Sequence, residues 1–239
     1  MININNGRKL AFTLAEVLLT LGIIGLVAAI TIPALMQRYQ KSQTITQLKS
    51  FYSDMQQCLK LSQIDNEEFA NWTSDLLTRQ SGKERNRYFY EKYLQPYLKG
   101  TIFCDGLGSK NQCTPSKIYN LNGTETTNLL TDNDVAFLSP QGYSVFFWVS
   151  GTAGSASMYI DTNGPKKGPN TVGKDVFAFG LWLSNSTKGF YAQGEYQNLS
   201  REDMMKSNSS SSCLKDRTGT YCSGLIIKDG WQFASDYPW

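Results

Sequence analysis

The chain has 239 residues, a net charge of +3 and no histidine. Its 41% hydrophobic and 13% aromatic content is enough for a packed core, which argues against wholesale disorder. The small net charge does not indicate a nucleic-acid partner, and the lack of histidine excludes Ser-His and Cys-His nucleophile pairs and most zinc sites.

The first element is an apolar segment from Leu10 to Gln37, in which Glu16 is the only charged residue. As a helix, this segment would extend about 42 Å, whereas the hydrocarbon core of a bilayer is about 30 Å thick. The segment is also longer than the apolar region of a secretory signal peptide, which has about 7–15 residues. Because Arg8 and Lys9 precede it, we expect a cytoplasmic N-terminus and an exported remainder.

Glu16 is an unfavourable residue for a membrane span, since a carboxylate at mid-membrane costs about 2.5–3.5 kcal/mol on insertion scales. One interpretation is a residue tolerated near the cytoplasmic interface. The other is a functional residue, because ionisable groups inside membranes are often functional. If the chain is cut after Ala11, the new α-ammonium group of Phe12 in a neighbouring subunit could meet Glu16.

The stretch AFTLAEVLLTLGIIGLVAAITIPALMQ resembles the N-terminus of type IV prepilins and type II secretion pseudopilins, and the resemblance covers roughly residues 8–37. In that family a prepilin peptidase removes a short basic leader before a Phe, whose new amine is methylated. A Glu then occupies the fifth mature position. Phe12 and Glu16 match these residues, and Pro33 matches a helix-breaking proline at mature position 22 (33 − 11). Ala11 departs from the pattern, because glycine is usual before the cut.

The resemblance implies an α+β fold in which a long N-terminal helix packs its outer half on a C-terminal antiparallel β-sheet. It divides the chain into a leader (1–11), a transmembrane and assembly helix (12–37), an amphipathic continuation (38–69) and an exported globular domain (70–239). The implied partners are the prepilin peptidase, other pilin or pseudopilin subunits and the inner-membrane assembly platform. The implied location is a single pass through the inner membrane, followed by an extracytoplasmic filament.

Three residues are expected to weaken or break the apolar helix: Gly22, Gly25 and Pro33. Beyond it, apolar residues step by three and four along one face of a further helical stretch, at Ile45, Leu48, Tyr52, Met55 and Leu59. The pattern is lost over residues 62–69, where we expect the helix to end. A second, short helix is predicted within residues 86–100, with Asn86 as its N-cap.

Four aromatic and β-branched runs then predict strands, over residues 143–150, 157–161, 175–184 and 189–194. Because no segment with a helical period separates them, the sheet should be antiparallel. Four of the five cysteines form two close pairs, Cys104/Cys113 and Cys213/Cys222, without metal-site spacing. We therefore expect two disulfides and an oxidising, extracytoplasmic compartment, with Cys58 as a buried helical thiol.

The loop DTNGPKKGPNTVGKD, residues 161–175, supplies oxygen donors from Asp161, Asn163 and Asp175. Calcium takes six to eight such oxygens, so this is a candidate calcium site, although the EF-hand pattern is absent. The alternative is a hairpin loop shaped by Asx-turns, and three nearby lysines oppose cation binding. Major pseudopilins carry calcium in the corresponding region, which is an analogy of location alone.

These observations favour a structural subunit, a pilin or pseudopilin and a minor one by its length, of a type IV pilus or type II secretion filament. The alternative is a tip-located binding module for DNA, a surface or a secreted substrate. The nearest candidate for DNA contact is KERNRYFYEKY, residues 83–93. Its pattern favours an amphipathic helix with a solvated charged face, so nucleic acid is not expected as a partner. With no nucleophile motif and no phosphate-binding loop, we do not expect an enzyme.

Overall fold

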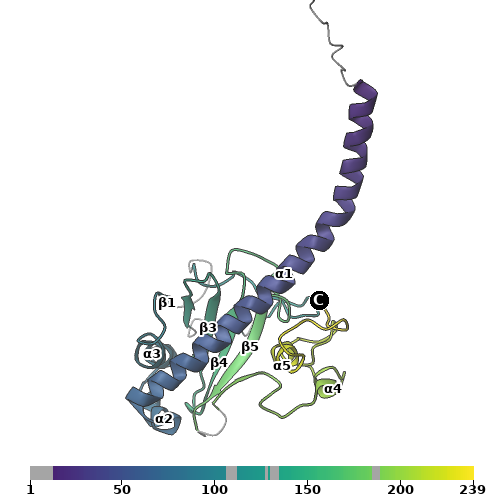
Figure 1. The fold of residues 1–239 in the computed structure, drawn as a ribbon. Coiled ribbons are helices and arrows are strands. Elements are labelled where there is room, and N and C mark those ends of the chain that lie inside the picture. The colour runs from purple at the N-terminus through teal and green to yellow at the C-terminus, as the bar shows by residue number, and fades with distance from the viewer. Residues whose placement is uncertain (1–12, 106–111, 127–128, 130–134, 185–188) are drawn as a thin grey trace, which may run out of the picture. The chain divides into compact units, whose positions relative to one another are not determined.

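The computed structural model describes residues 13–105, 112–126, 129, 135–184 and 189–239 (Figure 1). It has the predicted α+β architecture: a long N-terminal helix, α1 (Leu14–Asn66), and a six-stranded antiparallel sheet. The chain divides into two compact units, Met1–Ser42 and Gln43–Trp239, with the boundary inside α1.

In the first unit, α1 runs without interruption through Gly22, Gly25 and Pro33. The helix break expected at these residues is therefore absent. A proline removes one backbone donor, and an otherwise continuous hydrogen-bond ladder can hold the helix through that point. Among the described residues, α1 is the one helix that is long and apolar enough to cross a membrane.

In the second unit, the remainder of α1 buries the predicted apolar stripe. Leu48, Met55 and Leu59 are buried, and Ile45 and Tyr52 pack at the edge of the core. The helix ends at Asn66, inside the stretch predicted to end it. Four further residues complete the buried face: Thr44, Phe51, Ser62, and Cys58 as a free, buried thiol.

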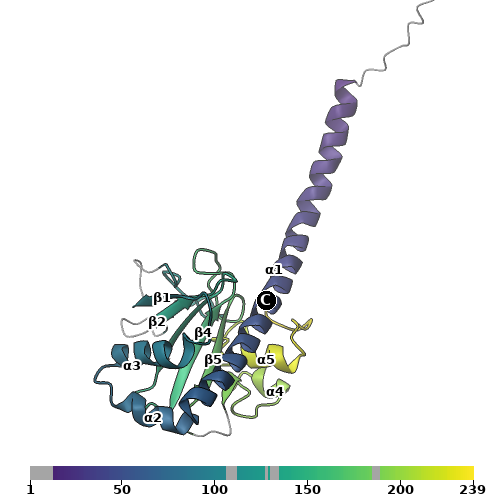
Figure 2. The same ribbon diagram turned by 60° about the vertical axis from the view of Figure 1, so that its left-hand side comes forward.

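The sheet has its strands in chain order, each antiparallel to the next (Figure 2). The strands are β1 (Ile102–Asp105), β2 (Val135–Leu138), β3 (Ser144–Val149), β4 (Ser155–Asp161), β5 (Val176–Trp182) and β6 (Phe190–Ala192). One face packs against α1, where the Phe51 ring lies 5.1 Å from Phe179 and 5.8 Å from Phe190. The last four strands correspond to the predicted ones, whereas β1 and β2 were not predicted.

Two short helices follow α1 and cover the same side of the sheet: α2 (Phe69–Leu77) and α3 (Gly82–Phe89), which continues into the π-helical turn η1 (Tyr90–Leu94). The prediction of Asn86 as an N-cap is wrong. Ser81 caps α3, because its side chain accepts the backbone N–H of Glu84. Asn86 lies inside the helix, where its Oδ1 accepts the buried backbone N–H of Val149 at 2.7 Å.

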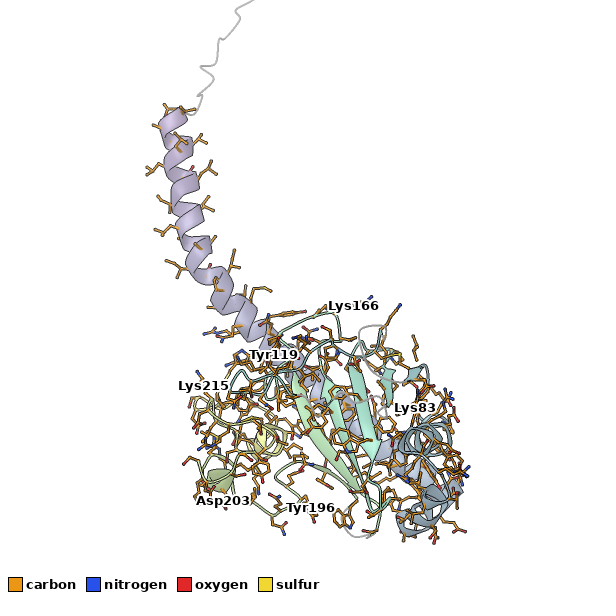
Figure 3. The ribbon with its side chains drawn as sticks, turned by 180° about the vertical axis from the view of Figure 1, so that it is seen from behind. Lys83, Tyr119, Lys166, Tyr196, Asp203 and Lys215 are labelled. Atoms are coloured by element: carbon orange, nitrogen blue, oxygen red, sulfur yellow. A yellow bond between two sulfur atoms is a disulfide. The ribbon has the colours of Figure 1, made fainter. Side chains whose placement is uncertain are left out.

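The opposite face of the sheet is seen in Figure 3. A smaller apolar cluster covers part of it, built from Cys113, Ile118, Ala136, Phe146, Val172 and Val176. The chain ends with α4 (Arg201–Met204), α5 (Cys222–Lys228) and a C-terminal tail, residues 231–239. Both predicted disulfides are present, Cys104–Cys113 and Cys213–Cys222.

Candidate functional site

The most unusual polar arrangement lies in the loop that joins β4 to β5, where the sequence predicted a cation site. Asp161 is the last residue of β4, and it lies directly opposite Ser144 of β3. Because cross-strand partners project to the same face, the two side chains are neighbours on the face away from α1. Both residues have an exposed fraction of 0%.

The carboxylate of Asp161 is only half satisfied. Its Oδ1 accepts the backbone N–H groups of Asn163 and Gly164 at 3.3 and 3.2 Å. Its Oδ2, and the hydroxyl of Ser144, are buried without a hydrogen-bond partner among the described residues. Burial first, and then the charge of Asp175, raise the pKa of Asp161 to about 8. A buried, half-satisfied carboxylate is unfavourable unless a proton or a cation accompanies it.

Asp175 organises the loop. Its Oδ1 accepts the N–H of Thr171 at 2.6 Å, and its Oδ2 accepts the N–H of Asn170 at 2.8 Å and the side-chain amide of Asn163 at 3.1 Å. Burial raises its pKa, and these hydrogen bonds oppose the shift. Both of its oxygens are thus used inside the protein, which distinguishes it from Asp161.

Two asparagines add further unpaired oxygens. The side-chain nitrogen of Asn163 donates to the carbonyl oxygen of Gly168 and to Asp175. The Oδ1 on the other side of the same amide group therefore points away from these two acceptors. That Oδ1, like the Oδ1 of Asn170, is buried without a partner in the part of the chain that the structure describes. Hydrogen bonds connect Asp161, Asn163, Asn170 and Asp175, so these four residues belong to one polar cluster.

The donor set fits a hard cation that prefers oxygen ligands, such as calcium. Within the described ranges, no group of three His, Cys, Asp or Glu side chains that could hold a metal ion lies together. Lys166 and Lys167 are exposed, and Figure 3 shows Lys166 projecting from the domain. Sequence reasoning did not single out Ser144 or Asn170. Ser144 could be found only from the strand register, and Asn170 only from its unpaired oxygen.

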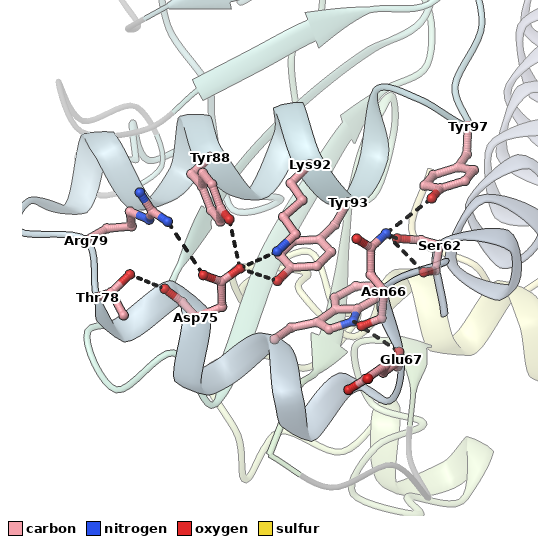
Figure 4. Close-up of polar contacts among 11 residues, drawn as sticks. Ser62, Asn66, Glu67, Asp75, Thr78, Arg79, Tyr88, Lys92, Tyr93 and Tyr97 are labelled. Carbon is pink, nitrogen blue, oxygen red and sulfur yellow. Dashed lines mark hydrogen bonds and ion pairs between the residues drawn. The ribbon is translucent and has the colours of Figure 1, made fainter. Parts of the chain in front are cut away.

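A second polar cluster joins α2 to α3 and η1 (Figure 4). The Oδ2 of Asp75 accepts from Tyr88 and Tyr93 at 2.8 Å each and from Lys92 at 2.6 Å. Partial burial would raise the pKa of Asp75, but the hydrogen bonds from Lys92 and the two tyrosines outweigh it and lower that pKa to about 2. Because Tyr88, Lys92 and Tyr93 all donate to one carboxylate on α2, these contacts hold the helices together.

The profile of the Family of unknown function (DUF6613) matches residues 34–239. The chain belongs to this family. No curated protein and no solved structure matches the chain. The DUF6613 match includes the 161–175 loop and the whole second unit, but it begins just after Pro33. It therefore leaves the apolar segment before that residue outside the family region.

Three of the four basic residues of α3 and η1 pair with carboxylates, and the fourth, Arg85, donates to the backbone carbonyls of Leu76 and Ser150. Lys83 and Arg87 both pair with Asp105, at 3.5 and 2.6 Å, and Lys92 pairs with Asp75. Arg87 also lies 3.7 Å from Glu91. These three cations consequently offer little free charge to a phosphate backbone.

Ahead of the DUF6613 region, Glu16 lies in the first turn of α1. Its Oε2 accepts from both the backbone N–H and the hydroxyl of Thr13, at 2.9 Å each, while the Thr13 hydroxyl accepts the N–H of Glu16. This reciprocal arrangement is a capping box, which the Thr-x-x-Glu spacing could have signalled. Ala11 and Phe12, the predicted processing site, lie outside the described residues.

Proposed function

We propose that the protein is a structural subunit, a pilin or pseudopilin, of a type IV pilus or type II secretion filament. The observation that carries this proposal is the surface of the first half of α1. Its large apolar side chains from Leu14 to Tyr39 are between 43% and 81% exposed. In water such a surface is strongly unfavourable, so the segment requires a membrane or other apolar chains around it.

A filament subunit uses both environments in turn. The helix first spans the inner membrane, and after cleavage by the prepilin peptidase it packs among the helices of neighbouring subunits. The globular domain is exported, which agrees with its two disulfides. In this proposal, Glu16 meets the α-ammonium group of Phe12 in an adjacent subunit and sets the axial register.

Cleavage between Ala11 and Phe12 tests the first step. The mature protein should begin at Phe12 with a methylated amine. Mass spectrometry of the N-terminal peptide, from protein purified from its own host, measures this directly. An intact Met1, or a start near Ile30, would contradict the proposal.

The role of Glu16 in assembly requires a pair of substitutions, because the residue also completes the capping box. Glu16→Gln keeps a side chain that can accept the Thr13 hydrogen bonds but removes the charge, whereas Glu16→Val removes both. If the charge pairs with a neighbour, both variants should be cleaved and inserted normally but depleted from sheared filaments. If only the cap matters, Glu16→Gln should behave as wild type.

Competition makes this comparison quantitative, because wild-type neighbours can carry a weak subunit into a fibre. Each variant is co-expressed with the unaltered chain, and the two are counted by peptide mass spectrometry in membranes and in filaments. Thr13→Ala serves as the matched control, since it loses the cap and keeps the carboxylate. Equal filament-to-membrane ratios for Glu16→Gln and wild type would remove the carboxylate from the assembly mechanism.

A further inference from the structure

We propose that a hydroxyl-lined groove, formed by residues 120–126 and 207–220 of the second unit, binds a neutral oligosaccharide. The groove consists of two adjoining cavities of about 340 and 260 Å³, which share Ser210 and Thr218 in their linings. It lies on the side of the sheet away from α1 (Figure 3), where Tyr159 of β4 contributes to its wall. The inference is independent of the filament assignment, because it concerns the second unit alone.

The fold holds both walls of the groove in place. Leu121, in the first wall, donates its backbone N–H to the carbonyl of Thr218 in the second wall at 3.0 Å. Thr218 in turn donates its own N–H to the carbonyl of Ser210 at 2.8 Å, which joins the two parts of the second wall. The C-terminal disulfide spans a section of the same wall. The groove is therefore preformed, as binding sites for small ligands usually are.

Most of the groove is lined by side chains that can both donate and accept a hydrogen bond. They are serines, threonines and asparagines, together with Tyr159. Every hydroxyl of a sugar is likewise a donor and an acceptor, so the groups of the protein and of the sugar can pair in either direction. An apolar ligand would instead leave the groups of the groove unpaired, which is unfavourable. The lining therefore fits a polyhydroxylated ligand.

The charged residues that line the described part of the groove are paired within the protein. Glu125 accepts Lys117 at 2.8 Å, and Asp216 lies 3.1 Å from Arg217. Arg217 also donates to the backbone carbonyl of Ser207 at 2.8 Å. Because these charges compensate one another, the groove has no excess charge to attract an anion or a cation. This favours a neutral sugar over an acidic polysaccharide or a nucleic acid.

Two hydroxyl groups at the larger cavity are available to a ligand. The Oγ1 of Thr126 is buried without a partner among the described residues, and it belongs to the same lining as Tyr159. The ring of Tyr159 lies parallel to the rings of Phe146 and Trp148, at 5.6 and 5.8 Å, which fixes its position. Burial is the one cause that raises the pKa of Tyr159, to about 12, so its hydroxyl has no charged partner in the described structure. A sugar hydroxyl in this cavity would supply the missing hydrogen bonds.

Binding is measured by calorimetry on the full chain, in a detergent without a sugar headgroup so that the detergent does not compete for the groove. The probes are the neutral trisaccharides maltotriose, cellotriose and triacetylchitotriose, and trigalacturonic acid is the acidic comparison. We expect saturable binding of at least one neutral probe, with one site per chain, and weaker binding of the acidic one. Absence of saturable binding of all the neutral probes at millimolar concentration would overturn the proposal, as would tighter binding of trigalacturonic acid.

Thr126→Val and Thr114→Val form a matched pair of variants. Each removes a hydroxyl that is buried without a partner in the described structure, and Thr126 lines the groove whereas Thr114 does not. Neither change should lower the melting temperature, because neither hydroxyl makes a hydrogen bond that would be lost. Thr126→Val should weaken binding of the neutral probe by about three- to tenfold, the effect of one neutral hydrogen bond, and Thr114→Val should bind as wild type does.

Tyr159→Phe tests the opposite wall of the same cavity. It keeps the ring and its contacts with Phe146 and Trp148 but removes the hydroxyl, so the domain should melt as wild type does. Binding of the neutral probe should again weaken by about three- to tenfold. If Thr126→Val and Tyr159→Phe both bind the probe with wild-type affinity, the sugar does not occupy this groove and the proposal is wrong.

Discussion

At the scale of single residues, Asp75 shows how one carboxylate joins three short elements. It lies in α2, and its partners Tyr88, Lys92 and Tyr93 lie in α3 and η1. Arg79 adds an ion pair at 3.5 Å from the same helix. Helices of this length are marginal alone, so the hydrogen bonds between them add to their stability.

The lowered pKa of Asp75 gives a prediction about acid stability. A carboxyl group whose folded pKa lies near 2, below its unfolded value of 3.8, stabilises the folded state above about pH 4. That contribution is lost as the pH falls through 2. Asp75→Asn should therefore reduce the free energy of unfolding at pH 6, and the difference from wild type should shrink between pH 4 and 2. Urea denaturation at several pH values measures it.

The matched control for this prediction is Asp216→Asn. Asp216 is an exposed carboxylate that pairs only with its neighbour Arg217 in the described structure. Because surface pairs contribute about 0–1 kcal/mol, the control should show little effect at any of these pH values. A pH-independent loss in Asp75→Asn would mean that the carboxylate acts through packing and not through its charge.

Asn86 is a second residue whose role depends on a distant partner. Its Oδ1 accepts the N–H of Val149 in β3, and the residue is 1% exposed. Asn86→Ala would leave that buried donor unpaired, which costs about 1–3 kcal/mol. We expect a loss of this size in urea denaturation, and no measurable loss for the exposed Asn208→Ala. An unchanged midpoint for Asn86→Ala would show that water replaces the side chain.

At the scale of elements, the contact between α1 and the sheet centres on one aromatic ring. Phe51 is fully buried and meets Tyr143, Phe179 and Phe190 edge-on, with ring centroids 5.1 to 5.8 Å apart. It therefore ties the second half of α1 to the β2–β3 turn, β5 and β6. Such a ring contributes apolar burial together with favourable aromatic geometry.

Phe51→Ala should destabilise the second unit by about 3–5 kcal/mol, because the cavity left by a deleted phenyl ring collapses only partly. The control is Ile64→Ala on the same helix, where the side chain is 77% exposed and the change should be small. Thermal denaturation followed by near-ultraviolet circular dichroism reports both. Equal midpoints for the two variants would mean that α1 is not anchored through Phe51.

The sequence predicted the elements in which apolar residues recur at regular spacing or form a continuous run. The stripe on α1 and strands β3 to β6 carry enough apolar residues to define a face or a run. By contrast, α2 and β1 are short, and β1 is exposed at both ends, so their pairing is decided by the surrounding structure. The same limit applies within the loop, because the neighbour of Asp161 in β3 depends on strand register.

At the scale of the whole molecule, one sequence resemblance ends and one family match begins at nearly the same place in the chain. The prepilin-like resemblance covers roughly residues 8–37, and the match to the family of unknown function covers residues 34–239. The compact units meet between Ser42 and Gln43. An apolar helical segment is thus followed by a domain with its own core, so the two parts can be studied separately.

A fragment of residues 38–239 tests that separation. It contains the complete buried core, which lies entirely between Leu48 and Tyr237, and it lacks the exposed apolar residues from Leu14 to Met36. Expressed in an oxidising compartment, it should be soluble and monodisperse by light scattering. Its cooperative melt should match the corresponding transition of the full chain in detergent, because removing the segment takes nothing from the core. An aggregated fragment, or one without a cooperative transition, would show that the domain depends on the segment that precedes it.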